Sequence, residues 1–229
     1  MKLGRKDWIA LGVLLTGIAW ELYQKSKGKS LLGSRTVSAS ADFVKKLWPI
    51  AKAYENQTGI KAFLGMAEAS EESNYGLSQL ASPPRTLGTP GTGGGNNLFG
   101  ITAEPGTYWR DQGHPYVEMP THEWLKNEPG SPYYDASKPE GSIIKVAMVR
   151  PFRAYPSWAA SYADWGRLMQ TQHYVDAGAL AALKSGNPQE FGAALNRAGY
   201  ASDPNYGLKV EGRVQVLEPF IQQEMNNNA

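Results

Sequence analysis

Three glutamates, Glu68, Glu71 and Glu72, lie within five residues of one another, in a stretch from Lys61 to Leu80 whose residue types predict a helix. Residues three and four apart share one face of a helix, so these carboxylates repel one another. One of them therefore has a reason to keep its proton near neutral pH, and a protonated carboxyl can act as a general acid. The alternative is an acidic, solvated helix face without a catalytic role.

Four further motifs follow, each combining aromatic, amide or acidic side chains. They are Asn-Asn-Leu-Phe-Gly-Ile (96–101), Thr-His-Glu (121–123), Phe-Arg-Ala-Tyr-Pro-Ser-Trp (152–158) and Gly-Tyr-Ala-Ser-Asp-Pro-Asn-Tyr (199–206). With Glu-Ser-Asn-Tyr-Gly (72–76) before them, and in this order, they resemble the glucosaminidases of glycoside hydrolase family 73. That family includes flagellar-type wall hydrolases and many bacterial and phage autolysins. The resemblance covers residues 40–225.

The resemblance implies a catalytic role for three residues. Glu72 matches the general acid, Glu123 matches a second carboxylate, and Tyr206 matches a tyrosine that supports the reacting sugar through its hydroxyl. Glycoside hydrolysis needs an acid for the leaving oxygen and a second group at the oxocarbenium-like centre. Glu123 would be a base that activates water, or a charge that stabilises attack by the substrate's own acetamido group. No metal or organic cofactor is implied.

Three other residues are expected to bind substrate or line its cleft, namely Asn97, Phe99 and Tyr200. The sequence also departs from the family pattern. Glu68 and Glu71 stand where the family more often has uncharged residues, so the acid is expected in an unusually negative site. Asn-Tyr (74–75) replaces the commoner Gly-Trp, and a Pro- and Gly-rich insertion (126–141) follows Glu123.

The implied activity is cleavage of the β-1,4 bond after N-acetylglucosamine in the peptidoglycan glycan strand. One alternative is a lytic transglycosylase, for which Gly-Leu-Ser-Gln (76–79) is only a partial match to the expected run. Another is a catalytically silent protein that docks on murein within an envelope machine or virion. Retention of Glu72, Glu123 and Tyr206 together favours the glucosaminidase.

Composition excludes several classes of protein. The chain has 229 residues and no Cys, which rules out disulfides, thiol catalysis and thiolate metal sites. The three histidines, His114, His122 and His173, lack metal-ligand spacing. The net charge of +2 divides into +5 for residues 1–35 and −3 for the remainder, so no nucleic-acid partner is expected.

The basic N-terminal charge flanks an apolar segment, residues 8–23, bounded by aromatic side chains. Sixteen helical residues span roughly 24 Å, somewhat less than a bilayer core of about 30 Å, but flanking Lys and Arg can snorkel. A cleaved signal peptide is the alternative. We expect an uncleaved transmembrane anchor (1–24), a flexible tether (25–40) and a catalytic domain (41–229). The domain would lie on the peptidoglycan side of a cell envelope or virion membrane.

Hydrophobic spacing indicates an α+β fold, with a helical lobe and a small antiparallel β-lobe around a cleft, and the resemblance implies that this fold is lysozyme-like. Strands are expected within residues 116–124 and 143–149. Helices are expected around three apolar sets, which are Phe43, Leu47, Ala51 and Tyr54; Trp158, Tyr162, Trp165 and Met169; and Tyr206, Val210, Leu217 and Ile221. Asn-Pro-Gln-Glu (187–190) is a helix start, with Asn187 as the cap.

Overall fold

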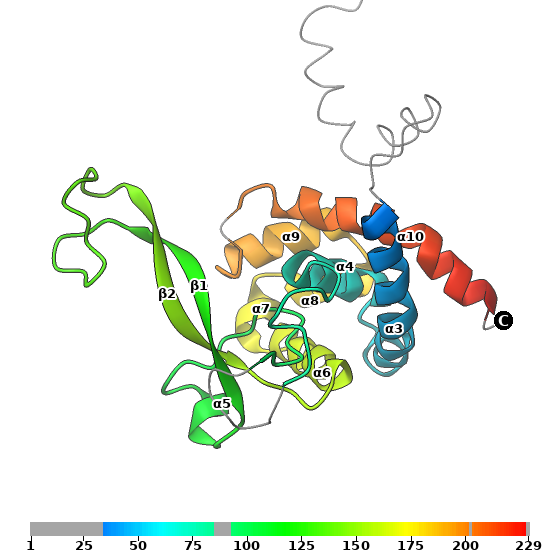
Figure 1. Cartoon of the computed structure of the whole chain (residues 1–229). Helices are drawn as coiled ribbons and strands as arrows, with labels where there is room; N and C mark the ends of the chain where they lie inside the picture. The colour runs from blue at the N-terminus through cyan, green and yellow to red at the C-terminus, as the bar shows by residue number, and fades with distance from the viewer. Residues whose placement is uncertain (1–33, 85–92, 202, 228–229) are drawn as a thin grey trace, which may run out of the picture.

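A computed structural model describes residues 34–84, 93–201 and 203–227. Most helices gather in one body, and two strands project from it as a long hairpin (Figure 1). The helices are α3 (Ser34–Thr58), α4 (Ala62–Ser73), α5 (Tyr108–Asp111), α6 (Trp158–Met169), α7 (Gln172–Asp176), α8 (Ala179–Ser185), α9 (Pro188–Arg197) and α10 (Tyr206–Asn227). The strands are β1 (Tyr116–Lys126) and β2 (Ile143–Arg153). The expected combination of a helical lobe and an antiparallel sheet is confirmed.

Helix α4 forms the centre of the helical body and contacts α3 and α10. Nine of its twelve residues are buried, so it is covered on nearly all sides. Gly65 makes this possible, because a Cβ there would overlap the hydroxyl of Tyr162 and lie 2.9 Å from the ring of Trp165. Those two side chains are fully buried and bring α6 against α4.

Helix α4 ends at Ser73, so the prediction that it continues to Leu80 is wrong. Asn74, Tyr75 and Gly76 have φ values of 50°, 58° and 73°, and this left-handed backbone cannot continue a right-handed helix. The Ser73 hydroxyl accepts a hydrogen bond from the Gly76 amide at 2.8 Å, which fixes the turn. Leu77, which follows this turn, is 67% exposed and does not join the core.

The other helical predictions are confirmed. The four residues expected along α6 are all buried, as are the four expected along α10. Asn187 caps α9 by accepting a hydrogen bond from the Glu190 amide at 3.0 Å, with Pro188 at the first helical position. Such a cap satisfies one of the amides that a helix start leaves without a partner.

Strands β1 and β2 pair in continuous antiparallel register from Tyr116↔Arg153 to Lys126↔Ile143. Burial alternates along β2, so one face of the hairpin is better covered than the other. The connecting loop is ordered around Asn127, whose amide group donates to the carbonyls of Asp135 and Lys138 and accepts from the Asp135 amide. The insertion is therefore a loop at the hairpin tip that is held together by hydrogen bonds to Asn127.

The predicted anchor (8–23) lies outside the described residues. Helix α3 begins at Ser34, so the last part of the expected tether (25–40) is helical, and Ser40 is buried. Within the described part of the chain, no helix has the length and apolar character needed to cross a membrane.

Candidate active site

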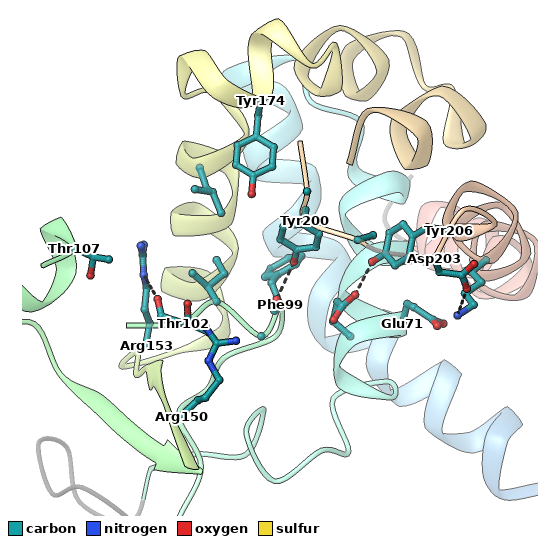
Figure 2. Close-up of a pocket in the computed structure, with 17 residues that line it drawn as sticks. Glu71, Phe99, Thr102, Thr107, Arg150, Arg153, Tyr174, Tyr200, Asp203 and Tyr206 are labelled. Carbon is teal, nitrogen blue, oxygen red and sulfur yellow. Dashed lines mark hydrogen bonds and ion pairs between the residues drawn. The ribbon is translucent and has the colours of Figure 1, made fainter. Parts of the chain in front are cut away.

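A groove of about 710 Å³ lies between the C-terminal end of α4 and the base of the hairpin. Its walls come from α4, the segment 99–102, the end of β2, and the segment 199–206 that leads into α10. Arg150 and Arg153 lie on one side, facing Glu71 and Tyr206 on the other (Figure 2). The groove therefore joins elements that are far apart in the sequence.

Glu72 is the central acid of this groove. It occupies the last turn of α4, and its Oε1 accepts a hydrogen bond from the Tyr206 hydroxyl at 2.6 Å (dashed in Figure 2). Its side chain opens onto the groove, but the surrounding groove walls keep part of the solvent away from its carboxyl. This desolvation raises the pKa of Glu72. The Tyr206 hydrogen bond opposes the increase, the charge of Glu71 adds to it, and that of Lys209 reduces it.

Glu71 is held by an ion pair. Its Oε2 accepts from Nε of Arg213 at 2.6 Å, and the same guanidinium binds the Tyr75 hydroxyl. Arg213 also lies over the Tyr75 ring, 4.7 Å from its centroid. The negative charge of Glu71 beside Glu72 is thus partly compensated.

Glu68 lies one helical turn before Glu72 and is fully buried. Its Oε2 accepts a hydrogen bond from the indole N–H of Trp165 at 3.1 Å. Burial raises its pKa well above the usual value, and the charge of Glu72 adds to the increase. The three glutamates therefore have three different environments: an ion pair, an open groove and the core.

The segment 97–101 is organised by Asn97, which the sequence suggested as a substrate-binding residue. Its side chain is buried and donates to the carbonyls of Ile101 and Arg153 at 2.9 and 3.0 Å. Its Oδ1 accepts from the amides of Phe99 and Ile101. Asn97 is absent from the groove lining and joins this segment to β2.

Phe99 and Tyr200 line the groove. The Phe99 ring stacks on Trp165 with centroids 4.8 Å apart, and its carbonyl accepts from the Tyr200 hydroxyl at 2.9 Å. The next residue, Gly100, has φ 64°, and a Cβ there would lie 3.8 Å from Oε2 of Glu72. The backbone thus passes beside the carboxyl oxygen that Tyr206 does not engage.

Tyr206 is buried at the start of α10, and burial raises the pKa of its hydroxyl. Asp203, three residues earlier, also lines the groove and was not singled out from the sequence. Its carboxylate pairs with Lys209 at 2.7 Å. Hydrogen bonds from Lys209 and from the Asn205 amide lower its pKa. The Asp-Pro-x-Tyr pattern was the available signal for this carboxylate.

Glu123 lies on β1 opposite Val146. Positions 119 and 150, nearer the helical body, are paired with each other. Arg150 lines the groove, and position 123 is four residues, or about 13 Å, farther along the strand from position 119. The structure thus brings Glu72, Tyr206, Tyr200 and Phe99 together at the groove.

Two basic residues of the groove, Arg150 and Arg153, were missed in the sequence. Arg150 pairs with Glu104 at 2.6 Å, and Arg153 pairs at 2.8 Å with Asp164, which also accepts from the Tyr155 hydroxyl. Their signal was weak, because basic residues at the end of a strand are common on any surface. Both guanidinium groups lie on the wall opposite Glu71 and Glu72, each beside its own carboxylate partner.

Comparison with known proteins identifies the family. The model described as "Glucosaminidase: Mannosyl-glycoprotein endo-beta-N-acetylglucosaminidase" matches residues 48–218. The chain is 30% identical over 180 residues to "Peptidoglycan hydrolase FlgJ" of Salmonella typhimurium, covering 78% of this chain and 46% of that protein. It is 29% identical over 170 residues to "Probable N-acetylmuramidase" of Lactococcus lactis, covering 73% and 31%. The chain spans less than half the length of these curated relatives.

Solved structures share the fold. The truncated glycoside hydrolase domain of Salmonella typhimurium FlgJ is 26% identical, with a TM-score of 0.51, covering 79% of this chain and 98% of that one. Peptidoglycan hydrolase from Sphingomonas sp. A1 is 23% identical, with a TM-score of 0.55, covering 82% and 95%. These similarities agree with the α+β, lysozyme-like class expected from the sequence.

Proposed function

The chain belongs to the glucosaminidase family, glycoside hydrolase family 73, and on this premise we propose that it is a peptidoglycan hydrolase. Its reaction in this proposal is hydrolysis of the β-1,4 bond after N-acetylglucosamine in the glycan strand. The observation that carries the proposal is Glu72, an acid with a raised pKa that faces an open groove and is held at 2.6 Å by Tyr206.

In this mechanism Glu72 protonates the glycosidic oxygen as the bond to the anomeric carbon breaks. A carboxyl must retain its proton near neutral pH to do this, and desolvation in the groove favours the protonated form. The Tyr206 hydroxyl engages Oε1, so Oε2, on the Gly100 side, is the oxygen that delivers the proton. The groove is open, as a long polymeric substrate requires.

Glu123 is the second carboxylate in the proposal. It would act as the base that activates water, or as the charge that stabilises attack by the acetamido group of the substrate. The match of Glu123 to the second carboxylate of the family supports this role. Glu123→Gln should reduce hydrolysis strongly without affecting the melting temperature, because it changes a charge on a projecting strand.

The groove walls would bind the glycan strand. Tyr200 supplies aromatic surface beside Glu72, Phe99 lies beneath it with its ring in the core, and Asn97 holds the segment that carries Phe99. Arg150 and Arg153 on the opposite wall suit the carboxylates of the peptide stems that peptidoglycan carries. Tyr206 would support the reacting sugar in addition to holding Glu72.

Product analysis tests this proposal. Purified peptidoglycan is digested, the fragments are reduced with borohydride, and their ends are identified by mass spectrometry. Reduced N-acetylglucosamine ends are expected. Reduced muramic acid ends would assign the muramidase specificity named for the Lactococcus relative, and anhydro-muramic ends would assign a lytic transglycosylase. Absence of product from the folded full-length chain would favour a silent murein-docking protein.

Residues 8–23 would anchor the enzyme in a membrane, with the catalytic domain on the peptidoglycan side of an envelope or virion membrane. Envelope or virion assembly partners are compatible with such an anchor. The test is fractionation of cells that express the full chain. The wild-type protein should stay with membranes after alkaline extraction, whereas the double variant Leu14→Lys, Leu15→Lys should be released from them. Equal release of both proteins would refute the anchor.

A further inference from the structure

Glu68 is a buried carboxyl to which the proposed reaction assigns no role. It lies on α4 one turn before Glu72, with none of its surface exposed. Trp165 of α6 contacts one carboxyl oxygen, and the side chain of Tyr200 interacts with the carboxyl from the groove wall. Glu68 therefore lies between a tryptophan of the core and a tyrosine of the groove.

The hydrogen-bond inventory at this carboxyl is incomplete for an ionised group. Oε2 accepts from Trp165, but within the described part of the chain no group donates to Oε1 with hydrogen-bond geometry. Tyr200 cannot supply the proton, because its hydroxyl already donates to the Phe99 carbonyl at 2.9 Å. A charged and buried Oε1 without a donor would be strongly unfavourable.

A proton on Oε1 removes this difficulty, because the carboxyl is then neutral and Oε1 needs no donor. The Tyr200 hydroxyl oxygen, which interacts with the Glu68 carboxyl, still has acceptor capacity after donating to Phe99. The neighbouring titratable groups also favour an uncharged Glu68, because those that interact with it are all acids and cannot neutralise a carboxylate. They are Glu72 of α4, Tyr162 of α6, Tyr174 of α7, Tyr200, and Tyr206 of α10.

We propose that Glu68 is a positioning residue that remains uncharged in the folded protein and donates its proton to the Tyr200 hydroxyl oxygen. The chain Trp165–Glu68–Tyr200–Phe99 then fixes the aromatic wall beside Glu72. It also keeps a second negative charge away from the rear of Glu72. The protonation of Glu68 follows from the fold alone, whereas its positioning role rests on the proposed function.

Stability as a function of pH tests the protonation without any substrate. Glu68 keeps its proton in the folded state but loses it above its ordinary pKa of 4.5 in the unfolded state, so it destabilises the fold increasingly as pH rises. Glu68→Gln removes this penalty. Its melting temperature relative to wild type should rise steadily between about pH 4 and pH 8. A difference that is constant with pH would overturn the proposal.

Glu55→Gln is the matched control, because Glu55 should give the opposite slope. Burial raises the pKa of Glu55, but the Ala62 amide and the Lys52 ammonium outweigh it, so the net pKa is lowered. Its charge stabilises the fold above the ordinary pKa of 4.5 and this contribution is lost as pH falls. Glu55→Gln should therefore lose melting temperature relative to wild type as pH rises.

Infrared difference spectroscopy reports the proton directly. The spectrum of wild type minus Glu68→Gln at neutral pH should contain the C=O stretch of a protonated carboxylic acid. A carboxylate band in its place would overturn the proposal. Neither this measurement nor the stability series depends on hydrolysis, so both decide the state of Glu68 even if the chain proves inactive.

Activity then tests the positioning role. Glu68→Gln retains a donor for Tyr200 and should leave both the rate and the alkaline limb of the pH profile unchanged. Glu68→Met removes the donor and should lower kcat/KM by up to about tenfold, the effect of one lost hydrogen bond. If Glu68 were ionised, Glu68→Gln would remove a charge beside Glu72 and move the alkaline limb to lower pH. Equal rates for the Gln and Met variants would refute the positioning role.

Discussion

The hydroxyl of Tyr206 donates a 2.6 Å hydrogen bond to Oε1 of Glu72, across 134 residues of sequence. The bond ties the first residue of α10 to the last turn of α4. It favours the charged form of Glu72, whereas desolvation favours the protonated form. The proton affinity of the proposed acid is therefore a balance that single substitutions can shift.

Tyr206→Phe should shift this balance toward the protonated acid. Without the hydroxyl the pKa of Glu72 rises further, because a hydrogen bond to its charged form is lost. A general acid works while protonated, so activity falls as pH rises through its pKa, and this alkaline limb should move to higher pH. The pH dependence of kcat/KM checks the shift. A limb that moves to lower pH would contradict it.

The ion pair between Glu71 and Arg213 offers two opposite perturbations of Glu72. The charge of Glu71 raises the pKa of Glu72, so Glu71→Gln should move the alkaline limb to lower pH. Arg213→Gln leaves Glu71 without its 2.6 Å partner and should move the limb to higher pH. Rate profiles of the two variants at low salt provide the measurement. Shifts in the same direction would show that the pair does not act on Glu72 electrostatically.

Gly65→Ala should destabilise the fold. The new Cβ would overlap the Tyr162 hydroxyl, which is fully buried and cannot move aside, so we expect a loss of roughly 1–3 kcal/mol. Gly212→Ala is the matched control, since Gly212 lies in α10 with open space around it. It should be neutral or stabilising by about 0.5–1 kcal/mol. Urea unfolding of both variants decides, and equal stabilities would contradict the close packing of α4 and α6.

The sequence predicted those elements whose causes are local. The apolar spacing of α6 and α10 and the cap at Asn187 follow from helix geometry and from donors near in sequence. The end of α4 was not predicted, because the left-handed Tyr75 contacts Phe43 and Arg213, which are distant in sequence, in addition to the local bond between Ser73 and Gly76.

The same distinction holds for the site. Helical spacing identified three mutually repelling glutamates, but the surroundings of each depend on remote residues. Trp165 of α6 donates a hydrogen bond to the buried Glu68, and Arg213 of α10 pairs with Glu71. Similarly, Arg150 becomes a groove residue only when β2 returns to the helical body. Spacing along one helix carries none of this information.

The most direct test of the account is the rate at which Glu72→Gln degrades purified peptidoglycan. The substitution keeps the shape of the side chain and removes the transferable proton, so we expect a loss of about 10²–10⁴-fold. Glu218→Gln, an exposed change on α10, is the control and should retain the wild-type rate. A folded Glu72→Gln protein that degrades peptidoglycan as fast as this control would contradict the assignment of Glu72 as the general acid.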